Sequence, residues 1–194
     1  MIDELRQYTF SVEAWEQYWE LFTSMCMPIR GNDFGQLRGL WYDRIGDTVS
    51  FRHVWRYESL DARTHLRAEL IKIDDWREKF LPQAAQHVSQ QFLQVLIPKL
   101  DEGEAGLAAA RYLHSYRCPT GKAASVIQQI GGVKGEARKR LCGLWGTEFS
   151  DPNQVVAMTS TEEAPVLTLS AAVAIETRRL QPLGLEQPSS DFRA

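Results

Sequence analysis

The sequence predicts an α+β fold in which two ferredoxin-like halves, each of the split β-α-β type, are fused in one chain of 194 residues. Two observations support this. The hexapeptide LRGLWY at residues 37–42 is nearly repeated as LCGLWG at residues 141–146. The order of predicted elements around the two copies is also the same, and one offset of 104 residues (143 minus 39) continues into the strand that follows each copy. A single offset across two strands indicates an internal repeat.

In the first half, the residue pattern predicts a strand, a helix, a hairpin, further helix and a closing strand. Ser11 ends a β-favouring stretch, and its hydroxyl can cap a helix. Apolar residues then recur in steps of three and four from Val12 to Cys26, which is typical of an amphipathic helix. Ser59 caps the next helix. The expected elements are strand 4–10, helix 12–26, loop 28–35, strands 36–46 and 49–57 with a turn at 46–47, helix 60–70, a short helix from 74 or 75 interrupted near residue 82, and strand 88–97.

The second half is predicted to be shorter and to end in a tail. Strand 112–118 precedes a short helix that Thr120 caps, the strand with the second GLW, and a strand that ends at Thr161. Only residues 162–174 precede the last strand, AIETRRLQPL, so a helix has been lost there, and the basic run EARKR is expected to be solvated surface on a loop or at a strand start. The expected domains are a first half at 1–100, a linker at 101–110, a second half at 111–184 and a disordered tail at 185–194.

Each such sheet would carry its helices on one face and leave the other face bare. Aromatic side chains on a bare face would form a larger apolar patch than soluble proteins usually expose. We therefore expect the two sheets to pack face to face. The glycine of each GLW then permits close backbone approach, and the tryptophan fills space near the junction of the halves.

Composition argues against several classes of partner. The net charge is −3 with both signs interspersed, so neither nucleic acid nor an anionic membrane is an expected partner. Cys26, Cys118 and Cys142 lie far apart without a CxxC motif, so we expect reduced thiols and no metal site. The segment MIDELRQYTF lacks the apolar run of a signal or anchor. We therefore expect a cytoplasmic protein without membrane insertion.

Several short segments of the first half form a specific combination. They are ELRQYTF at the start, GLW in the second strand, HVWRYESLDAR at 53–63, DDW at 74–76 and VSQQ at 88–91. In this combination, residues 2–100 resemble the NIPSNAP family, and the second half resembles it weakly through GLWGTEF, DPNQVV and ETRRLQPL. The resemblance implies the dimeric α/β-barrel superfamily, in which two ferredoxin-like sheets form a barrel with a pocket inside. Its relatives include cofactor-independent oxygenases, heme-handling enzymes and isomerases, whereas many bacterial NIPSNAP members have no assigned reaction.

The candidate site residues lie on strands, where side chains alternate between two faces. Alternation places His53, Trp55 and Tyr57 on one face of strand 49–57. Hydrophobicity alone favours packing this aromatic face against helices. The second half argues the opposite, because the matching strand offers Val156 and Met158 as a helix-facing pair. We therefore expect the aromatic face to line the barrel interior, together with Glu4, Arg6 and Tyr8 and, in the second half, Tyr112, His114 and Tyr116.

Each candidate residue has a functional and a structural interpretation. His53 is a candidate general acid or base, or else a structural group that hydrogen-bonds Tyr8 or Glu4. Arg6 could hold a carboxylate or enolate in bidentate fashion, or pair with Glu4. Tyr8 could orient a substrate oxygen, or line the core. The candidate catalytic residues are His53, Arg6 and Tyr8, and the candidate ligand-binding residues are Trp41, Trp55, Tyr57, His114, Tyr116 and Arg178.

Two functional hypotheses remain open at this stage. One is a cofactor-independent enzyme that oxygenates, isomerises, dehydrates or cyclises a small, largely apolar metabolite, and the other is a non-catalytic binding or scaffold protein. The site of such an enzyme would be a composite of His53, Tyr8, His114 and Arg178. The alternative is that the second half has lost its site and serves only as a lid. No cofactor is expected, and heme is disfavoured because both histidines would have to face a porphyrin. The sequence leaves open the substrate and whether fused barrels form a homodimer.

Overall fold

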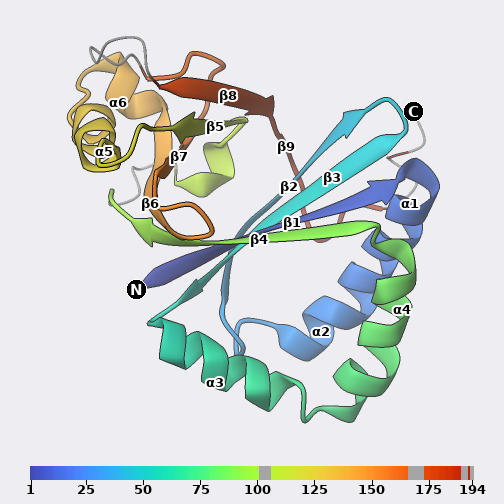
Figure 1. Ribbon diagram of the computed structural model, residues 1–194. Coiled ribbons are helices and arrows are strands. Elements are labelled where there is room, and N and C mark those ends of the chain that lie inside the picture. The colour runs from blue at the N-terminus through green and yellow to red at the C-terminus, as the bar shows by residue number, and fades with distance from the viewer. Residues whose placement is uncertain (101–105, 166–172, 189–191, 193–194) are drawn as a thin grey trace. The chain divides into compact units, whose positions relative to one another are not determined.

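The computed structural model describes residues 1–100, 106–165, 173–188 and 192 (Figure 1). The chain divides into two compact units, which are Met1–Leu93 with Leu183–Ala194 (the first unit) and Gln94–Pro182 (the second unit). Both contain antiparallel strands and helices, so the α+β class is confirmed. The division differs from the predicted one, because strand β4 (Gln90–Pro98) begins in the first unit and ends in the second. Residues 101–105 of the expected linker lie outside the described residues.

The first unit contains a sheet with strand order β4-β1-β3-β2 and helices on one face, as Figure 1 shows. The hydroxyls of Ser11 and Ser59 accept hydrogen bonds from the backbone N–H groups of Ala14 and Ala62, so both predicted caps are confirmed. Gly46, at φ +58°, forms the predicted hairpin turn. The elements are β1 (Ile2–Ser11), α1 (Val12–Leu21), a π turn (Phe22–Cys26), α2 (Met27–Arg30), β2 (Gln36–Ile45), β3 (Thr48–Tyr57), α3 (Leu60–Leu70), a second π turn (Asp75–Phe80) and α4 (Leu81–His87).

Helical structure extends further than predicted at two prolines. The first helix continues through a π turn into α2 and ends at Arg30, although a loop was expected from residue 28. Likewise α4 continues past Pro82. Both Pro28 and Pro82 stand in the first turn of a helix directly after a π turn, where a missing N–H is tolerated. The extension places Arg30 at the last position of α2.

The aromatic face of β3 packs against the helices, so its predicted placement inside a barrel is wrong. Phe51 makes ring contacts with Trp15 and Phe22, and His53 makes one with Phe22. In the second unit, Val155 and Ala157 pack with helix residues, whereas Val156 and Met158 lie on the other face of the strand. The assumption that Val156 and Met158 face the helices therefore failed. The larger apolar area of the aromatic face decided the orientation, as hydrophobicity alone suggests.

The second unit has strand order β8-β5-β7-β6-β4. Its elements are a 3₁₀ turn (Leu107–Ala109), β5 (Tyr112–Arg117), α5 (Ala123–Gly131), α6 (Glu136–Arg140), β6 (Leu141–Phe149), β7 (Gln154–Thr159), β8 (Ala174–Arg179) and the short β9 (Gln181–Pro182). The predicted Thr120 cap is wrong, because α5 begins after Lys122 without a side-chain cap. Residues 136–140 lie on the surface, as expected, but form a helical turn. Residues 166–172, where a helix was expected to be lost, lie outside the described residues.

The repeated GLW builds the same local packing in both units. A Cβ added to Gly39 would lie 2.2 Å from the Trp41 ring, and one added to Gly143 would lie 2.1 Å from the Trp145 ring. Each glycine therefore leaves room for the indole two residues later on the same face. A register shift falls at residues 37–39 in one hairpin and at 141–143 in the other, which is the same place in the repeat. The repeated hexapeptide thus corresponds to a repeated structure, because each hairpin contains the same bulge and the same glycine–tryptophan contact.

Two described residues near the end of the chain contact aromatic residues of α1, and the disordered tail expected from residue 185 stays a prediction. Phe192 is 5% exposed and lies with its ring centroid 5.2 Å from that of Trp15. The Trp19 indole N–H donates a hydrogen bond of 2.8 Å to the Gln187 carbonyl oxygen. The aromatic surface around Trp15 and Trp19 thus gains cover that the polar composition of the tail did not indicate.

The three cysteines, Cys26, Cys118 and Cys142, are free and buried, as predicted. No helix within the described ranges is long and apolar enough to cross a bilayer. The same residues contain no group of three or more His, Cys, Asp or Glu side chains that could hold a metal ion.

We predict that Gly39→Ala and Gly143→Ala each lower the free energy of unfolding by about 1–3 kcal/mol, because the new methyl group overlaps a buried indole. Urea denaturation followed by circular dichroism measures this. Gly131→Ala is the control, since its added Cβ would lie 3.5 Å from Leu144 Cδ2, an ordinary contact. A Gly143→Ala protein as stable as wild type would contradict the proposed packing role.

We also predict that Phe192→Ala lowers the free energy of unfolding by about 3 kcal/mol, because it empties a buried aromatic position. The matched control is Phe92→Ala, since Phe92 is 50% exposed. Equal unfolding midpoints for the two variants in urea would show that the tail adds no stability.

Candidate functional site

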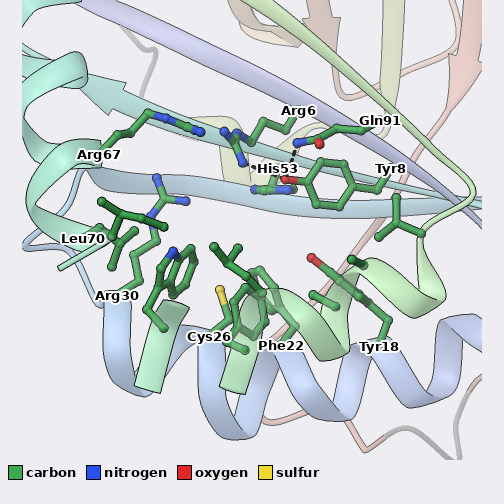
Figure 2. Close-up of a pocket in the computed structure, with 17 residues that line it drawn as sticks. Arg6, Tyr8, Tyr18, Phe22, Cys26, Arg30, His53, Arg67, Leu70 and Gln91 are labelled. Atoms are coloured by element: carbon green, nitrogen blue, oxygen red, sulfur yellow. Dashed lines mark hydrogen bonds between the residues drawn. The ribbon is translucent and has the colours of Figure 1, made fainter. Parts of the chain in front are cut away.

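A cavity of about 270 Å³ lies in the first unit between the sheet and the helices (Figure 2). Its lining residues all belong to that unit, and most are apolar. They are Arg6, Tyr8, Tyr18, Phe22, Cys26, Arg30, His53, Arg67, Leu70, Ile71, Trp76, Phe80, Leu81, Ala84, Ala85, Val88 and Gln91. We call this space the first-unit cavity.

The strands bring the three candidate catalytic residues, Arg6, Tyr8 and His53, together on the cavity wall. Arg6 pairs with His53 in the register of β1 and β3, and Tyr8 follows two residues later on the same face. Arg6 Nη1 donates a hydrogen bond of 2.7 Å to the Tyr8 hydroxyl, and Gln91 Nε2 donates another of 2.8 Å. Burial raises the pKa of Tyr8, so its hydroxyl is protonated at neutral pH. Because this oxygen accepts two hydrogen bonds, its own proton can be donated to a ligand.

His53 is a neutral imidazole whose tautomer is set by Trp55. The Trp55 indole N–H, which can only donate, lies 2.6 Å from His53 Nδ1. Nδ1 is therefore the acceptor, and the proton of the neutral ring sits on Nε2. Burial, and then the nearby charges of Arg6 and Arg30, hold the pKa of His53 well below its usual value. In this state His53 is a hydrogen-bond donor and does not fit a heme ligand, because iron would need the lone pair on Nε2.

His53 Nε2 is buried and has no hydrogen-bond partner among the described residues. Buried polar groups are almost always hydrogen-bonded, and an unsatisfied one costs about 1–3 kcal/mol. The ring borders the first-unit cavity. A ligand oxygen in the cavity would supply the missing acceptor.

Arg30 is the main residue that the sequence interpretation missed. It is 3% exposed, its guanidinium carbon lies 3.4 Å from the centroid of the Trp55 ring, and its Nη2 donates a 2.7 Å hydrogen bond to the Tyr57 hydroxyl. Figure 2 shows this guanidinium pointing from the helix side toward Arg6 and His53. The signal was present in the sequence, because Arg30 continues the apolar helical stripe one step of four beyond Cys26.

Glu4 interacts with several arginines beside the cavity. This fully buried carboxylate forms ion pairs with Arg6 and Arg63, and Arg67 Nη1 lies 3.9 Å from its Oε1. The predicted structural pairing of Arg6 with Glu4 is therefore present. It does not exclude a ligand role, because Arg6 also lines the cavity.

The remaining first-unit candidates lie in different places. Trp41 lies beside Arg52 in the register of β2 and β3, on the face opposite His53, so it does not reach the cavity. Trp55 contacts both His53 and Arg30 and so orients two cavity residues. The Tyr57 hydroxyl accepts a hydrogen bond from Arg30, and Tyr57 also borders a separate hollow near Gln36.

The second-unit candidates have partners within their own unit. His114 Nε2 lies 2.7 Å from the Thr159 hydroxyl and Nδ1 lies 2.9 Å from that of Thr177, and burial lowers the pKa of this ring to about 4. Tyr116 is buried in the core beside α5, and burial raises its pKa. Arg178 is exposed and forms an ion pair with Glu176. A composite site that joins them to His53 stays a prediction.

Comparison with protein families gives one match. A model of the NIPSNAP family matches residues 3–100. A search of curated proteins found no match.

Solved structures extend the comparison to the whole chain. A NIPSNAP family protein of unknown function from Agrobacterium tumefaciens is 26% identical, with 49% of this chain and 85% of that one covered and a TM-score of 0.45. A candidate monooxygenase from Lactobacillus acidophilus is 13% identical, with 93% of each chain covered and a TM-score of 0.61. An anthrone oxidase-like protein is 11% identical, with 94% of this chain and 91% of that one covered and a TM-score of 0.52. The last two similarities establish the fold alone.

We predict that acid conditions destabilise the protein partly through His53. The pKa of His53 is lower in the folded state than in the unfolded state. As the pH drops through 6.5, the unfolded state therefore binds more protons than the folded state, and the free energy of unfolding decreases. From pH 7.5 to 5.5 this ring should account for a loss of about 1.4 kcal/mol. His53→Gln, which cannot titrate, should lose that much less than wild type in urea denaturation at the two pH values. The same acid loss in both proteins would show that His53 is not held neutral. The same two-pH measurement on His114→Gln gives the contribution of the second buried imidazole to the acid loss.

Proposed function

The chain belongs to the NIPSNAP family, and from that premise we propose that its first unit binds a small, largely apolar molecule in the first-unit cavity and acts on it as a cofactor-independent enzyme. The observation that carries the proposal is the partnerless Nε2 of His53 at the wall of this cavity. Aromatic and aliphatic side chains surround a few polar groups there, which is the usual composition of a small-molecule site.

The polar groups favour chemistry at a ligand oxygen. His53 and Tyr8 offer hydrogen-bond donors beside the Arg6 guanidinium, and no carboxylate is among the described lining residues. Such donors can stabilise negative charge that develops on an oxygen during reaction. Oxygenation is the first reaction to test, because an enolisable aromatic substrate can itself supply electrons to O₂. Isomerisation, dehydration and cyclisation through an enolate use the same donors.

Non-catalytic binding is the second candidate function. It is favoured by the absence of a free base among the described lining residues, since burial raises the pKa of the Cys26 thiol to about 12 and His53 Nε2 already carries a proton. In that case the cavity would hold a ligand unchanged, as a carrier or sensor does.

We predict that a thermal-shift screen finds a stabilising ligand for wild type. The panel contains small aromatic acids, quinones, lactones, polyenes, anthrone and hemin. A ligand at about one hundred times its Kd should raise Tm by roughly 5–10 °C, because binding stabilises the native state by mass action. His53→Ala should lose most of this shift, whereas the control His65→Ala, which changes an exposed histidine outside the cavity, should keep it.

Catalysis is measured on the same proteins with an oxygen electrode and anthrone. Oxygen uptake above the buffer rate, lost in His53→Ala and kept in His65→Ala, supports the enzyme. A Tm shift without uptake or product formation favours the binding protein. No shift with any compound, together with a lower Tm of unliganded His53→Ala, would make His53 a structural residue and contradict both functions.

A further inference from the structure

We propose that the ligand of the first-unit cavity is an organic anion, whose carboxylate, enolate or phenolate oxygen lies between Arg30 and the group formed by Arg6, Tyr8 and His53. This inference rests on the proposed function only for the claim that the cavity binds a ligand. It adds the chemical class of the ligand and assigns a role to Arg30.

Positive charge exceeds negative charge around the cavity. The buried carboxylate of Glu4 is already shared by Arg6, Arg63 and Arg67. Within the described residues Arg30 forms no ion pair, although it is almost fully buried. A buried cation is costly unless an anion compensates it. The lowered pKa of Arg30, caused first by burial, reflects this cost.

No group among the described lining residues supplies the negative charge. Cys26 lines the cavity, but burial raises the pKa of its thiol to about 12, so it is uncharged at neutral pH. Burial also raises the pKa of Tyr8 and of Tyr57, which accepts a hydrogen bond from Arg30. The compensating anion therefore has to come from a ligand.

The polar groups of the cavity also have unused hydrogen-bonding capacity. Arg30 Nε is buried without a partner among the described residues, and so is His53 Nε2. The Tyr8 hydroxyl accepts from Arg6 and Gln91 and keeps its own proton. These groups all donate, and an anionic oxygen has only lone pairs to offer. Donors and ligand therefore match in kind, and charge-assisted hydrogen bonds are the strongest of this type.

The rest of the wall defines the body of the ligand. Phe22, Trp76, Phe80 and Leu70 also line the cavity. A volume of about 270 Å³ suits a molecule of one or two rings. An aromatic carboxylate or an ionised polycyclic phenol has both the apolar body and the single charge.

The test compares matched pairs of similar size and shape in which a carboxylate is replaced by a neutral amide: 2-naphthoate with 2-naphthamide, benzoate with benzamide, and salicylate with salicylamide. Isothermal titration at pH 7 gives each Kd for the full-length wild-type protein. The acid of at least one pair should bind about 10- to 100-fold more tightly than its amide, as expected when a charged partner replaces a neutral one.

Two variants then assign the preference to Arg30. Arg30→Met, which keeps the apolar stem near Trp55, should reduce the preference for the acid to about twofold or less, and Arg30→Lys should retain part of it because the charge remains. Arg77→Gln is the control. Arg77 does not line the cavity and pairs with Asp74 and Glu78 at the surface, so this variant should keep the wild-type preference. Near-ultraviolet circular dichroism establishes that each variant is folded.

The outcomes separate this inference from the proposed function. If every amide that binds does so as tightly as its acid, the anion inference is overturned and the small-molecule site is left standing, and this comparison needs no variant. An acid preference that persists in folded Arg30→Met, or is lost in Arg77→Gln, would overturn the role of Arg30. If no pair binds and the wider ligand panel also fails, the proposed function falls and the inference falls with it.

Discussion

The burial of the aromatic face of β3 against the helices is the constraint on which the first unit depends. Phe51 packs under α1, and the two-residue period of the strand then places His53 and Trp55 on the same face. The register of β1 brings Arg6 directly beside His53. A strand slipped by one residue would send all of these groups to the opposite face. The cavity and its polar wall therefore follow from the same packing that stabilises the core.

Trp55 links the polar chemistry of the cavity to this packing. Its N–H sets the tautomer of His53, and its ring face receives the guanidinium of Arg30. One fully buried side chain thus orients a neutral donor and a cation that come from different elements. Donors prepared in this way cost little reorganisation when a ligand oxygen arrives. The arrangement also explains why the histidine is better suited to donate a hydrogen bond than to accept a proton.

The two units share a backbone plan but not a site. Both hairpins keep the bulge and the contact between a glycine and the tryptophan two residues later. At the position of His53 the second unit has Ala157, and in the place of Arg6 it has His114, whose two nitrogens both lie within hydrogen-bonding distance of threonine hydroxyls. The repeat therefore preserves the residues that shape the hairpin, while the polar groups changed. Backbone geometry constrains the glycine, whereas a buried strand position accepts any side chain that fills its space.

The sequence by itself determined the α+β class, the repeat, most strand and helix positions and the grouping of Arg6, Tyr8 and His53, because strand alternation, helical spacing and capping are local properties. Only the tertiary structure decided which face of β3 meets the helices, since both orientations satisfy the same alternation and the choice depends on the total apolar area buried. It also decided that Phe192 is buried and that Arg30 stacks on Trp55, because these partners lie far away in the sequence. The helical stripe indicates which way Arg30 faces, but the long-range contact itself leaves no periodic signal in the chain.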